Sequence, residues 1–416
     1  MSRTYERKDC RLCGSRNLER VIDLAPTPPG NQFLKPHELQ SEEELYDLFV
    51  MYCKDCTHLQ LGMVIDPKIL FQRDYKYVSG TSPVFVQHLK DYCNWSIDRF
   101  KIPNDGLIVD IGSNDGTGLR CYKNKGYEVL GIDPATEIAA KATEQGIPTW
   151  DNFFDVKIAA KVCENFGKAD FITSHNACAH IDDLESVMKG VEHLLKDDGV
   201  FVFEVGYAME VYRNAYFDTI YHEHVDFHTV KPLVMFFERL NMVVIDVIQI
   251  NVQGGSIRVV VKKKNSKSLS EVTQNVQDCI DLEMATGFDD PQTFCDFSER
   301  IRLVGEELRN TLKGICLSGK KIAAYGAPTK STTLLTHFGI GKEEIDYIVD
   351  DNPKKQGLFS PVKHIPIVSK DKLTENPPDY LLILAWNFAD SIMEKNTKFA
   401  ENGGKFIFPM PEVKIV

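Results

Sequence analysis

Histidines, tyrosines and acids cluster in this 416-residue chain in patterns that could carry acid–base chemistry. Tyr221, His222, Glu223 and His224 are consecutive, and His228 follows closely. Imidazole has an ordinary pKa of about 6.5, which suits proton abstraction near neutrality. On a strand, His222 and His224 would share one face and Glu223 would take the other. The spacing is not the i, i+4 pattern of a helical zinc site, but the residues alone leave acid–base, metal-binding and structural roles open.

Two further segments could contact a ligand. His180 follows the predicted strand 169–174, at the edge where open α/β sheets bind their ligands. It is either a substrate contact or a structural histidine. The polar and aromatic stretch 71–82 contains Tyr75 and Tyr77. It could hydrogen-bond a ligand or serve as an ordinary connector.

A glycine-containing loop between a predicted strand and helix indicates a cofactor site. Asp110, Gly112 and Gly116 follow or close the apolar run 107–111, and glycine lets the backbone approach a ligand closely. Asp133 falls at the end of the next predicted strand, where an acid can bind both hydroxyls of a ribose. A dinucleotide site would have the GxGxxG spacing. The Asp-led, wider spacing favours S-adenosylmethionine, with a dinucleotide or no cofactor as the alternatives.

Four cysteines form two CxxC pairs, Cys10/Cys13 and Cys53/Cys56. Four thiolates can surround Zn²⁺ tetrahedrally, which predicts a zinc-ribbon-like module; the alternative is a chance pairing of free thiols. A closed site leaves no coordination position for substrate, so the zinc would be structural. The other cysteines show no pairing pattern, and an odd total of 11 argues against a disulfide framework.

The order of apolar runs predicts an α/β protein. Strands at 107–111, 127–132, 169–174 and 199–205 alternate with helices in a doubly wound arrangement, and a helix is predicted at 83–100. Strands at 242–247 and 256–261 would extend that sheet in antiparallel fashion. A helix-prone stretch, 268–317, leads to a second α/β unit with strands at 322–325, 345–349 and 380–384. There, 326–331 is either a phosphate loop carrying Lys330 or a plain strand–helix turn.

Composition narrows the class of partner. Hydrophobic residues make up 43% and charged residues 26%, as in soluble globular proteins. The 48 basic and 60 acidic side chains give a net charge of −12, which argues against a nucleic-acid partner. No apolar run approaches the roughly 20 residues of a membrane span, and the first residues have no signal-peptide core. We therefore expect a cytoplasmic protein without a membrane partner.

Taken together, these segments resemble the deoxysugar C-methyltransferases, the sugar nucleotide C-3 methyltransferases of antibiotic and polysaccharide pathways. The order and co-occurrence of the segments are more specific than any one of them. They comprise the four-cysteine module, YxYxSGTS at 75–82, DIGSNDG at 110–116, SHNxxAH at 174–180, FEV at 203–205, FDTIYHEH at 217–224, GGSxR at 254–258, YGAPTK at 325–330 and IPI at 365–367.

The resemblance implies a reaction and a set of roles. A dTDP- or GDP-linked 4-keto-6-deoxyhexose would lose its C3 proton to a base, and the resulting enolate would take the methyl group of S-adenosylmethionine. His224 would be the base, with Tyr221 and Glu223 positioning it or the sugar. Tyr75 or Tyr77, together with His180, would contact the sugar or stabilise the enolate oxygen.

The resemblance also implies an organisation. We expect a zinc-binding module at 1–68, a Rossmann-like class I methyltransferase domain at 69–285, and a C-terminal Rossmann-like α/β domain at 286–416 that helps bind the sugar nucleotide, in a monomer. The cofactor residues would be Asp110, Gly112, Asn114, Gly116, Asp133, Asn152, Phe153, His175 and Asn176. The substrate residues would be Ser79, Ser82, Glu204, Arg258, Tyr325 and Lys330, and the zinc ligands Cys10, Cys13, Cys53 and Cys56.

Three other functions are weighed against this one. An O- or N-methyltransferase of another small metabolite would need no carbon acid. An RNA-modifying methyltransferase guided by the zinc module is opposed by the negative charge. A non-catalytic, zinc-stapled binding protein is opposed by the intact Asp110, Gly112, Gly116 and Asp133.

Overall fold

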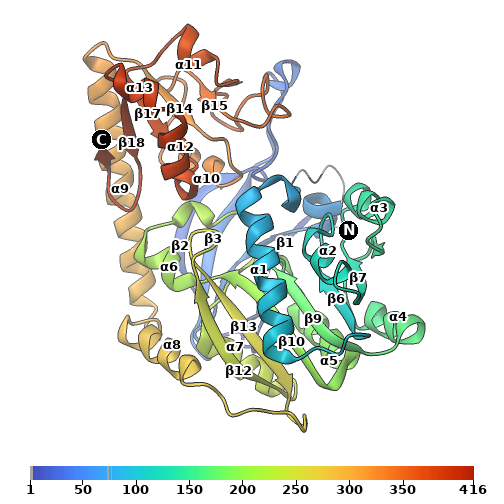
Figure 1. Cartoon of the computed structure of the whole chain (residues 1–416). Helices are drawn as coiled ribbons and strands as arrows, with labels where there is room; N and C mark the ends of the chain where they lie inside the picture. The colour runs from blue at the N-terminus through green and yellow to red at the C-terminus, as the bar shows by residue number, and fades with distance from the viewer. Residues whose placement is uncertain (1–2, 73–74, 76) are drawn as a thin grey trace.

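A seven-stranded sheet forms the centre of the protein (Figure 1). The computed structural model describes residues 3–72, 75 and 77–416. The strand order is β12-β13-β10-β9-β6-β7-β8, with β13 antiparallel to both of its neighbours and the remaining pairs parallel. The strands are β6 (Leu107–Ile111), β7 (Glu128–Ile132), β8 (Thr149–Trp150), β9 (Ala169–His175), β10 (Leu195–Gly206), β12 (Met242–Ile250) and β13 (Ser256–Lys263).

Helices cover both faces of this sheet, so its central strands are largely buried. All five residues of β6 are buried, as expected for a parallel strand covered on both sides. One face packs against α1 (Pro83–Phe100) and α2 (Thr117–Lys123). The other packs against α4 (Val156–Phe166), α5 (Leu184–Leu194) and α7 (Val230–Arg239), while α3 (Thr136–Glu144) and α6 (Ala208–Arg213) complete the unit. The predicted Rossmann-like fold and its antiparallel extension are confirmed.

An N-terminal antiparallel sheet includes one strand from the middle of the chain. Its order is β11-β4-β3-β2, in which Asp226 pairs with Gln60 and Phe227 pairs with Leu59. The sheet consists of β2 (Leu18–Thr27), β3 (Tyr46–Cys53), β4 (Leu59–Leu61) and β11 (Asp226–Phe227), and a separate ribbon pairs β1 (Thr4–Glu6) with β5 (Met63–Ile65). Short 3-10 or π turns lie at Pro36–Glu38, Lys68–Gln72, Ser79–Thr81, Cys178–His180, Phe217–Thr219 and Trp386–Phe388.

The C-terminal part is a second α/β unit, joined to the first by a long helix. Its sheet order is β16-β15-β14-β17-β18-β19, parallel except for β19. The elements are β14 (Ile322–Tyr325), β15 (Ile348–Val349), β16 (Ile367–Val368), β17 (Tyr380–Ile383), β18 (Lys405–Phe408), β19 (Lys414–Ile415), α10 (Ser331–His337), α11 (Lys372–Glu375), α12 (Ala389–Lys395) and α13 (Thr397–Glu401).

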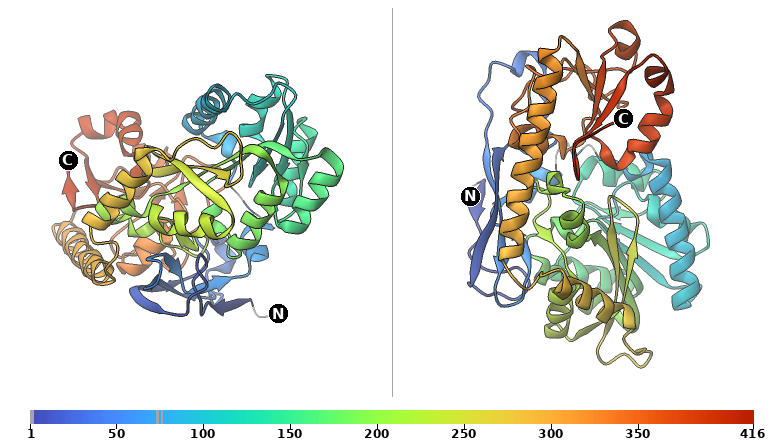
Figure 2. Two further views of the ribbon diagram at one scale, coloured as in Figure 1. Left: turned by 90° about the horizontal axis from the view of Figure 1, so that it is seen from below. Right: turned by 90° about the vertical axis from the view of Figure 1, so that its left-hand side faces the viewer.

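The helix-prone stretch forms α8 (Gln274–Ala285) and α9 (Gln292–Leu317). Figure 2 shows α9, in orange, running along the side of the molecule to the C-terminal unit. Its 26 residues correspond to about 39 Å of helix. Apolar residues recur every three or four positions and are buried, so one stripe of α9 packs against the rest of the protein; they are Phe294, Phe297, Ile301, Val304, Leu308, Leu312 and Ile315.

Among the described residues, no helix combines the length and the apolar composition that crossing a bilayer requires.

An aromatic clasp around Trp386 joins the two α/β units. The Trp386 ring stacks on Tyr216 with centroids 3.6 Å apart, and its Nε1 donates to Asp218 at 2.8 Å. The Lys330 ammonium lies 3.1 Å from the centre of the same ring system. Gly254 has a φ of +91°, and a Cβ there would come within 2.8 Å of the indole. The clasp therefore requires glycine at this position and fixes the C-terminal unit against the central sheet.

We expect Trp386→Ala to lower the free energy of unfolding by about 2 kcal/mol, because it removes the stack, the cation–π contact and the bond to buried Asp218. Urea unfolding followed by circular dichroism measures this change. Phe388→Ala, two residues away on a side chain that is 47% exposed, is the matched control. Equal stability of the two variants would contradict the clasp.

Candidate active site

The segment 217–224 folds as a turn and places its side chains on different sides. The short helix Phe217–Thr219 leads into a turn at Tyr221–Glu223 rather than a strand. His222 therefore points to the N-terminal sheet, where its Nε2 lies 3.2 Å from the Asp47 carbonyl oxygen. The alternation considered for a strand is wrong here, since Glu223 and His224 both belong to the other side of the turn, with Tyr221.

His224 is held with one ring nitrogen available as a base. Its Nδ1 lies 2.8 Å from the Thr219 carbonyl oxygen, which can only accept, so Nδ1 carries the hydrogen. Its Nε2 then accepts from the Tyr221 hydroxyl at 2.8 Å. Burial, with a smaller contribution from the Lys330 charge and against the bond to the Thr219 carbonyl, lowers the pKa of His224 to about 4. The ring is therefore neutral near pH 7.

His180 faces His224 across a small aromatic group. The two ring centroids are 4.9 Å apart, and Phe71 meets His180 edge-on at 5.4 Å. Burial lowers the pKa of His180 to about 3. Its Nδ1 is buried and has no hydrogen-bond partner in the described part of the chain. A buried, unpaired nitrogen is costly, so it marks a position where a ligand group would bind.

Tyr75 lies between the histidine turn and the glycine loop. Burial raises the pKa of its phenol, and the charges of Glu223 and Asp133 raise it further. Tyr77 instead hydrogen-bonds Ser79 and faces Asp115. Tyr75 is thus close enough to both predicted sites for their charges to act on it, while Tyr77 also acts electrostatically on Tyr221. Arg73, Asp74 and Lys76 lie outside the described residues.

Glu223 is a buried carboxyl group, which raises its pKa to about 7. One hydrogen bond opposes this shift: the Asn31 amide nitrogen lies 3.3 Å from Glu223 Oε1. Asn31 comes from the loop after β2 and is not among the site residues predicted from the sequence. The carboxyl group therefore titrates in the range where a group can exchange a proton near neutrality.

The glycine loop after β6 is built for close approach. Gly112 has a φ of +75°, and a Cβ there would come within 2.5 Å of Ala177. Asp133 accepts from the backbone of Asn114 at 2.8 Å and of Ala135 at 2.9 Å. Each carboxylate oxygen keeps a second lone pair, so Asp133 can still accept from the hydroxyls of a ribose.

The loop that contains Tyr75 is tied to this glycine loop. The Ser79 backbone donates to Asn114 Oδ1 at 2.8 Å, and Asn114 Nδ2 donates to the Tyr77 carbonyl at 3.1 Å. The Gly80 backbone donates to Asp115 at 3.1 Å. These hydrogen bonds therefore hold the predicted cofactor loop and the predicted substrate loop together.

Asp110, at the end of β6, has an unused oxygen. The residue is 3% exposed, and its Oδ1 has no partner among the described residues. Burial raises the pKa of this carboxyl to about 7, and the nearby His175 opposes the shift. A buried carboxylate with a free oxygen fits a ligand that brings a positive charge or a donor, as a sulfonium compound with an amino group does.

The remaining predicted cofactor residues lie at the ends of neighbouring strands. Asn152 and Phe153 follow β8, whose last residue Trp150 accepts from the Asp133 backbone at 3.0 Å. Asn176 follows β9 with a φ of +58°. Gly116 immediately precedes α2, has a φ of +72° and is packed against Ile147.

Glu204 is the centre of a buried hydrogen-bond network. It accepts from His88 at 2.7 Å, His175 at 3.0 Å and Arg258 at 2.8 Å. The two histidines and the carboxylate are close enough to hold a metal ion. The guanidinium of Arg258 already neutralises this carboxylate, which disfavours a further cation. The predicted substrate residues Glu204 and Arg258 thus bond each other.

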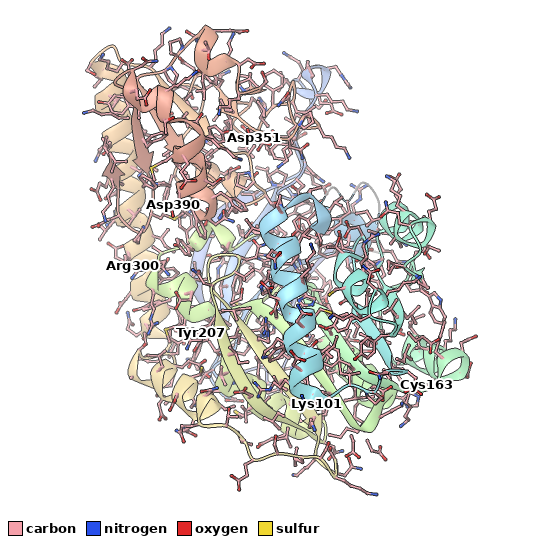
Figure 3. All side chains as sticks on the ribbon, in the orientation of Figure 1. Lys101, Cys163, Tyr207, Arg300, Asp351 and Asp390 are labelled. Carbon is pink, nitrogen blue, oxygen red and sulfur yellow. The ribbon has the colours of Figure 1, made fainter. Side chains whose placement is uncertain are left out.

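The other predicted substrate residues are spread over the protein. Ser82 caps α1 by accepting from the Phe85 backbone at 3.3 Å. Tyr325 donates to Asp351 at 2.8 Å within the C-terminal unit, where Figure 3 shows Asp351. Lys330 lies in the aromatic clasp, and burial lowers its pKa to about 8, opposed by the charge of Asp218. Of these residues, only Lys330 acts electrostatically on His224.

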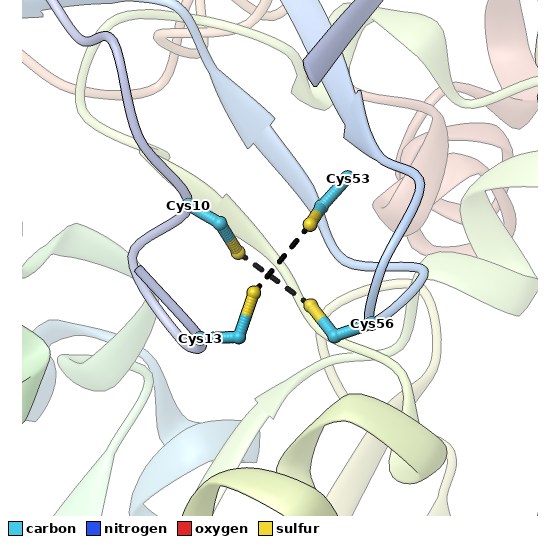
Figure 4. Close-up of side chains that lie close together, drawn as sticks. All are labelled: Cys10, Cys13, Cys53 and Cys56. Carbon is cyan, nitrogen blue, oxygen red and sulfur yellow. Dashed lines mark hydrogen bonds between the residues drawn. The ribbon is translucent and has the colours of Figure 1, made fainter. Parts of the chain in front are cut away.

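The four predicted zinc ligands come together (Figure 4). Sγ–Sγ distances are 3.5 Å for Cys10–Cys56 and for Cys13–Cys53, and all four sulfurs lie within 4.8 Å of one another. A tetrahedral zinc site with Zn–S bonds of about 2.3 Å has sulfurs about 3.8 Å apart. The cluster fits a closed four-thiolate zinc site.

Arg11 connects this cluster to the segment that carries His180. Its side chain is fully buried, and its Nε donates to Asp182 Oδ1 at 3.0 Å. Arg7 donates to the same oxygen at 2.9 Å. Asp182 lies two residues beyond His180, so the zinc knuckle anchors this end of the site. No spacing in the sequence signals this contact.

Family models match three consecutive parts of the chain. Residues 10–71 match a family model described as "Putative zinc binding domain", 85–247 match "Methyltransferase domain", and 251–411 match "C-methyltransferase C-terminal domain". C-methyltransferase NovU from Streptomyces niveus is 34% identical over 408 residues, which cover 98% of this chain and 96% of that protein.

Two solved structures each match less than half of this chain. Magnesium protoporphyrin IX methyltransferase from Synechocystis PCC 6803 with bound S-adenosylmethionine is 10% identical, with a TM-score of 0.33, over 43% of this chain and 79% of its own. An S-adenosylmethionine-dependent methyltransferase from Clostridium acetobutylicum is 16% identical, with a TM-score of 0.34, over 43% and 92%.

We expect Cys56→Ser to lose the bound zinc and to lower the melting temperature by several degrees, because the zinc holds a small module together. Zinc content by mass spectrometry and calorimetric melting test this. Cys316→Ser, which removes a half-buried thiol from α9, is the control. A Cys56→Ser protein with full zinc content and unchanged melting would refute the structural role.

Proposed function

The chain belongs to the family of S-adenosylmethionine-dependent C-methyltransferases, and from this premise we propose that it methylates C3 of a dTDP- or GDP-linked 4-keto-6-deoxyhexose through an enolate. The observation that carries this proposal is His224, a buried neutral imidazole with its Nε2 aimed at the Tyr221 hydroxyl. Methylation of a carbon acid requires such a base, whereas methylation of an oxygen or nitrogen atom depends less on a base.

Proton removal is the first step. The C4 ketone acidifies the C3 proton, and Nε2 of His224 takes it, either directly or through Tyr221. The bond from Nδ1 of His224 to the Thr219 carbonyl fixes the tautomer throughout and stabilises the imidazolium that forms. Because the site is buried, water does not compete for the base.

The enolate oxygen needs hydrogen-bond donors in place before charge develops. The Tyr75 phenol is proposed for this role, since it lies near the turn that carries His224. The other nitrogen of the neutral His180 ring donates to the Glu223 carbonyl, so its unpaired Nδ1 is an acceptor and is proposed to contact a hydroxyl group of the sugar. Glu223 is proposed to orient the sugar through a hydroxyl group. Lys330 is proposed to contact the anionic part of the substrate.

S-adenosylmethionine supplies an electrophilic methyl group on a sulfonium centre. Asp133 is proposed to bind its ribose, and Asp110 with its free oxygen is proposed to face its positively charged part. Tyr75, between Asp133 and Glu223, is proposed to separate the donor from the sugar at a fixed spacing.

Exchange of the C3 proton tests the enolate. The wild-type enzyme, loaded with S-adenosylhomocysteine to block transfer, should exchange C3–H of a 4-keto-6-deoxy sugar nucleotide in deuterated water, as followed by NMR. His224→Ala should exchange about 10³-fold more slowly and bind the donor normally. His193→Ala, an exposed histidine on α5, should behave as wild type.

Retention of the C3 proton by the wild-type enzyme, with every bound sugar nucleotide, would contradict the carbon-acid mechanism. Methylation of a heteroatom, in an O- or N-methyltransferase of another small metabolite, would then be the better reading.

Asp133→Ala should weaken S-adenosylhomocysteine binding at least tenfold, because a ribose hydroxyl loses a charged acceptor in a buried site. Calorimetric titration measures the dissociation constant. Asp151→Ala changes an exposed acid nearby and is the control. An unchanged affinity in Asp133→Ala would rule out the ribose contact.

A further inference from the structure

The N-terminal loop meets the loop before α10 at a close contact. A Cβ on Gly30 would come within 2.3 Å of Thr329 Cγ2 and 2.8 Å of the Thr329 carbonyl oxygen. The Thr332 hydroxyl donates to the Gly30 carbonyl at 3.3 Å. Only glycine allows the two loops to approach this closely, and the next residue, Asn31, is placed between them and Glu223.

Two hydrogen bonds form a chain from the C-terminal unit to Glu223. The Thr329 hydroxyl donates to Asn31 Oδ1 at 2.9 Å, and Asn31 Nδ2 donates to Glu223 Oε1 at 3.3 Å. An amide has one accepting and one donating end, so the Thr329 bond turns the donating end toward the carboxylate. Within the described part of the chain, Glu223 Oε2 has no hydrogen bond and stays available.

We propose that Asn31 is a positioning residue that holds the Glu223 carboxylate toward the substrate, and that Thr329 sets the orientation of the Asn31 amide. The inference deepens the proposed function and rests on it for the identity of the sugar. It assigns to the C-terminal unit a role in orienting a group of the reaction site, in addition to any contact with the nucleotide.

The same two hydrogen bonds affect the charge of Glu223. A donated hydrogen bond stabilises a carboxylate, so loss of the Asn31 amide raises the pKa of Glu223 beyond the rise that burial causes. Among the residues that the structure describes, the other titratable groups that face Glu223 are the phenols of Tyr75 and Tyr221, and the His180 ring, which bonds the Glu223 carbonyl.

Charges that lie farther from Glu223 act on the groups next to it. His224 follows Glu223 in the chain and bonds Tyr221, and the charge of Lys330 acts on His224. With Tyr75, Tyr221 and His180 unchanged in a variant of Asn31, a shift in the titration of Glu223 reports the lost amide.

The test is a direct titration of the carboxyl group in the full-length, zinc-containing protein with S-adenosylhomocysteine bound. Glutamate labelled with ¹³C at the carboxyl carbon gives one signal for Glu223, assigned by its loss in Glu223→Gln. In Asn31→Leu the pKa of Glu223 should rise by about one unit, and in Thr329→Val by a smaller amount. Exchange of C3–H at pH 7 should fall about tenfold in Asn31→Leu.

Two further variants separate hydrogen bonding from packing. Thr329→Ser keeps the hydroxyl and should restore the wild-type titration. Thr374→Val makes the same change as Thr329→Val at an exposed position of α11 and should have no effect. Zinc content and affinity for S-adenosylhomocysteine show that each variant is folded.

The outcomes distinguish this inference from the proposed function. An unchanged Glu223 titration in both Asn31→Leu and Thr329→Val, with both proteins folded, would overturn the role of Asn31 even if the sugar undergoes exchange. A shifted titration without C3–H exchange in any variant, wild type included, would support Asn31 and contradict the sugar substrate.

Discussion

The hydrogen bond between Nδ1 of His224 and the Thr219 carbonyl is the interaction on which the site depends. It decides which ring nitrogen can accept a proton, and it exists because 217–224 folds as a short helix and a turn. The same turn places Tyr221 next to the free nitrogen and His222 against the N-terminal sheet. Burial then keeps the imidazole neutral, so its second nitrogen can accept a proton, as the proposed base must.

Local patterns predicted most of the fold and part of the site. Buried parallel strands read as apolar runs, and paired CxxC motifs read as a zinc cluster, because both are set by short-range spacing. The turn at His222 was not predictable, since a carbonyl that bonds a side chain leaves no periodic signal. Asn31 was missed because it meets Glu223 across 192 residues of chain, and a Pro-Pro-Gly-Asn loop has no feature that marks it as functional. Trp386 follows the end of β17, a position at which ligand-facing residues are common, and that rule could have identified it.

The three parts of the chain share one apolar core, and polar contacts also join them at the site. Arg11 in the zinc knuckle bonds Asp182, beyond His180, and Asn31 bonds both Glu223 and Thr329. Each of these groups is costly to bury without its partner. Misplacement of any one part therefore leaves unpaired polar groups at the site. The free-energy cost of these unpaired groups favours the correct placement of the three parts. Zinc acts on the site in this indirect way, through the knuckle that it shapes.

The strand β11 has a consequence for how the protein is made. The zinc thiolates and three strands of the N-terminal sheet are complete by residue 61, but the fourth strand is encoded at Asp226–Phe227. At ordinary rates of translation, roughly 10 to 30 s pass between the two on the ribosome. During that interval β4 is an open edge, able to pair with another nascent chain. Early metal capture would order this half-built sheet, so zinc supply during synthesis should govern how much of the protein escapes aggregation.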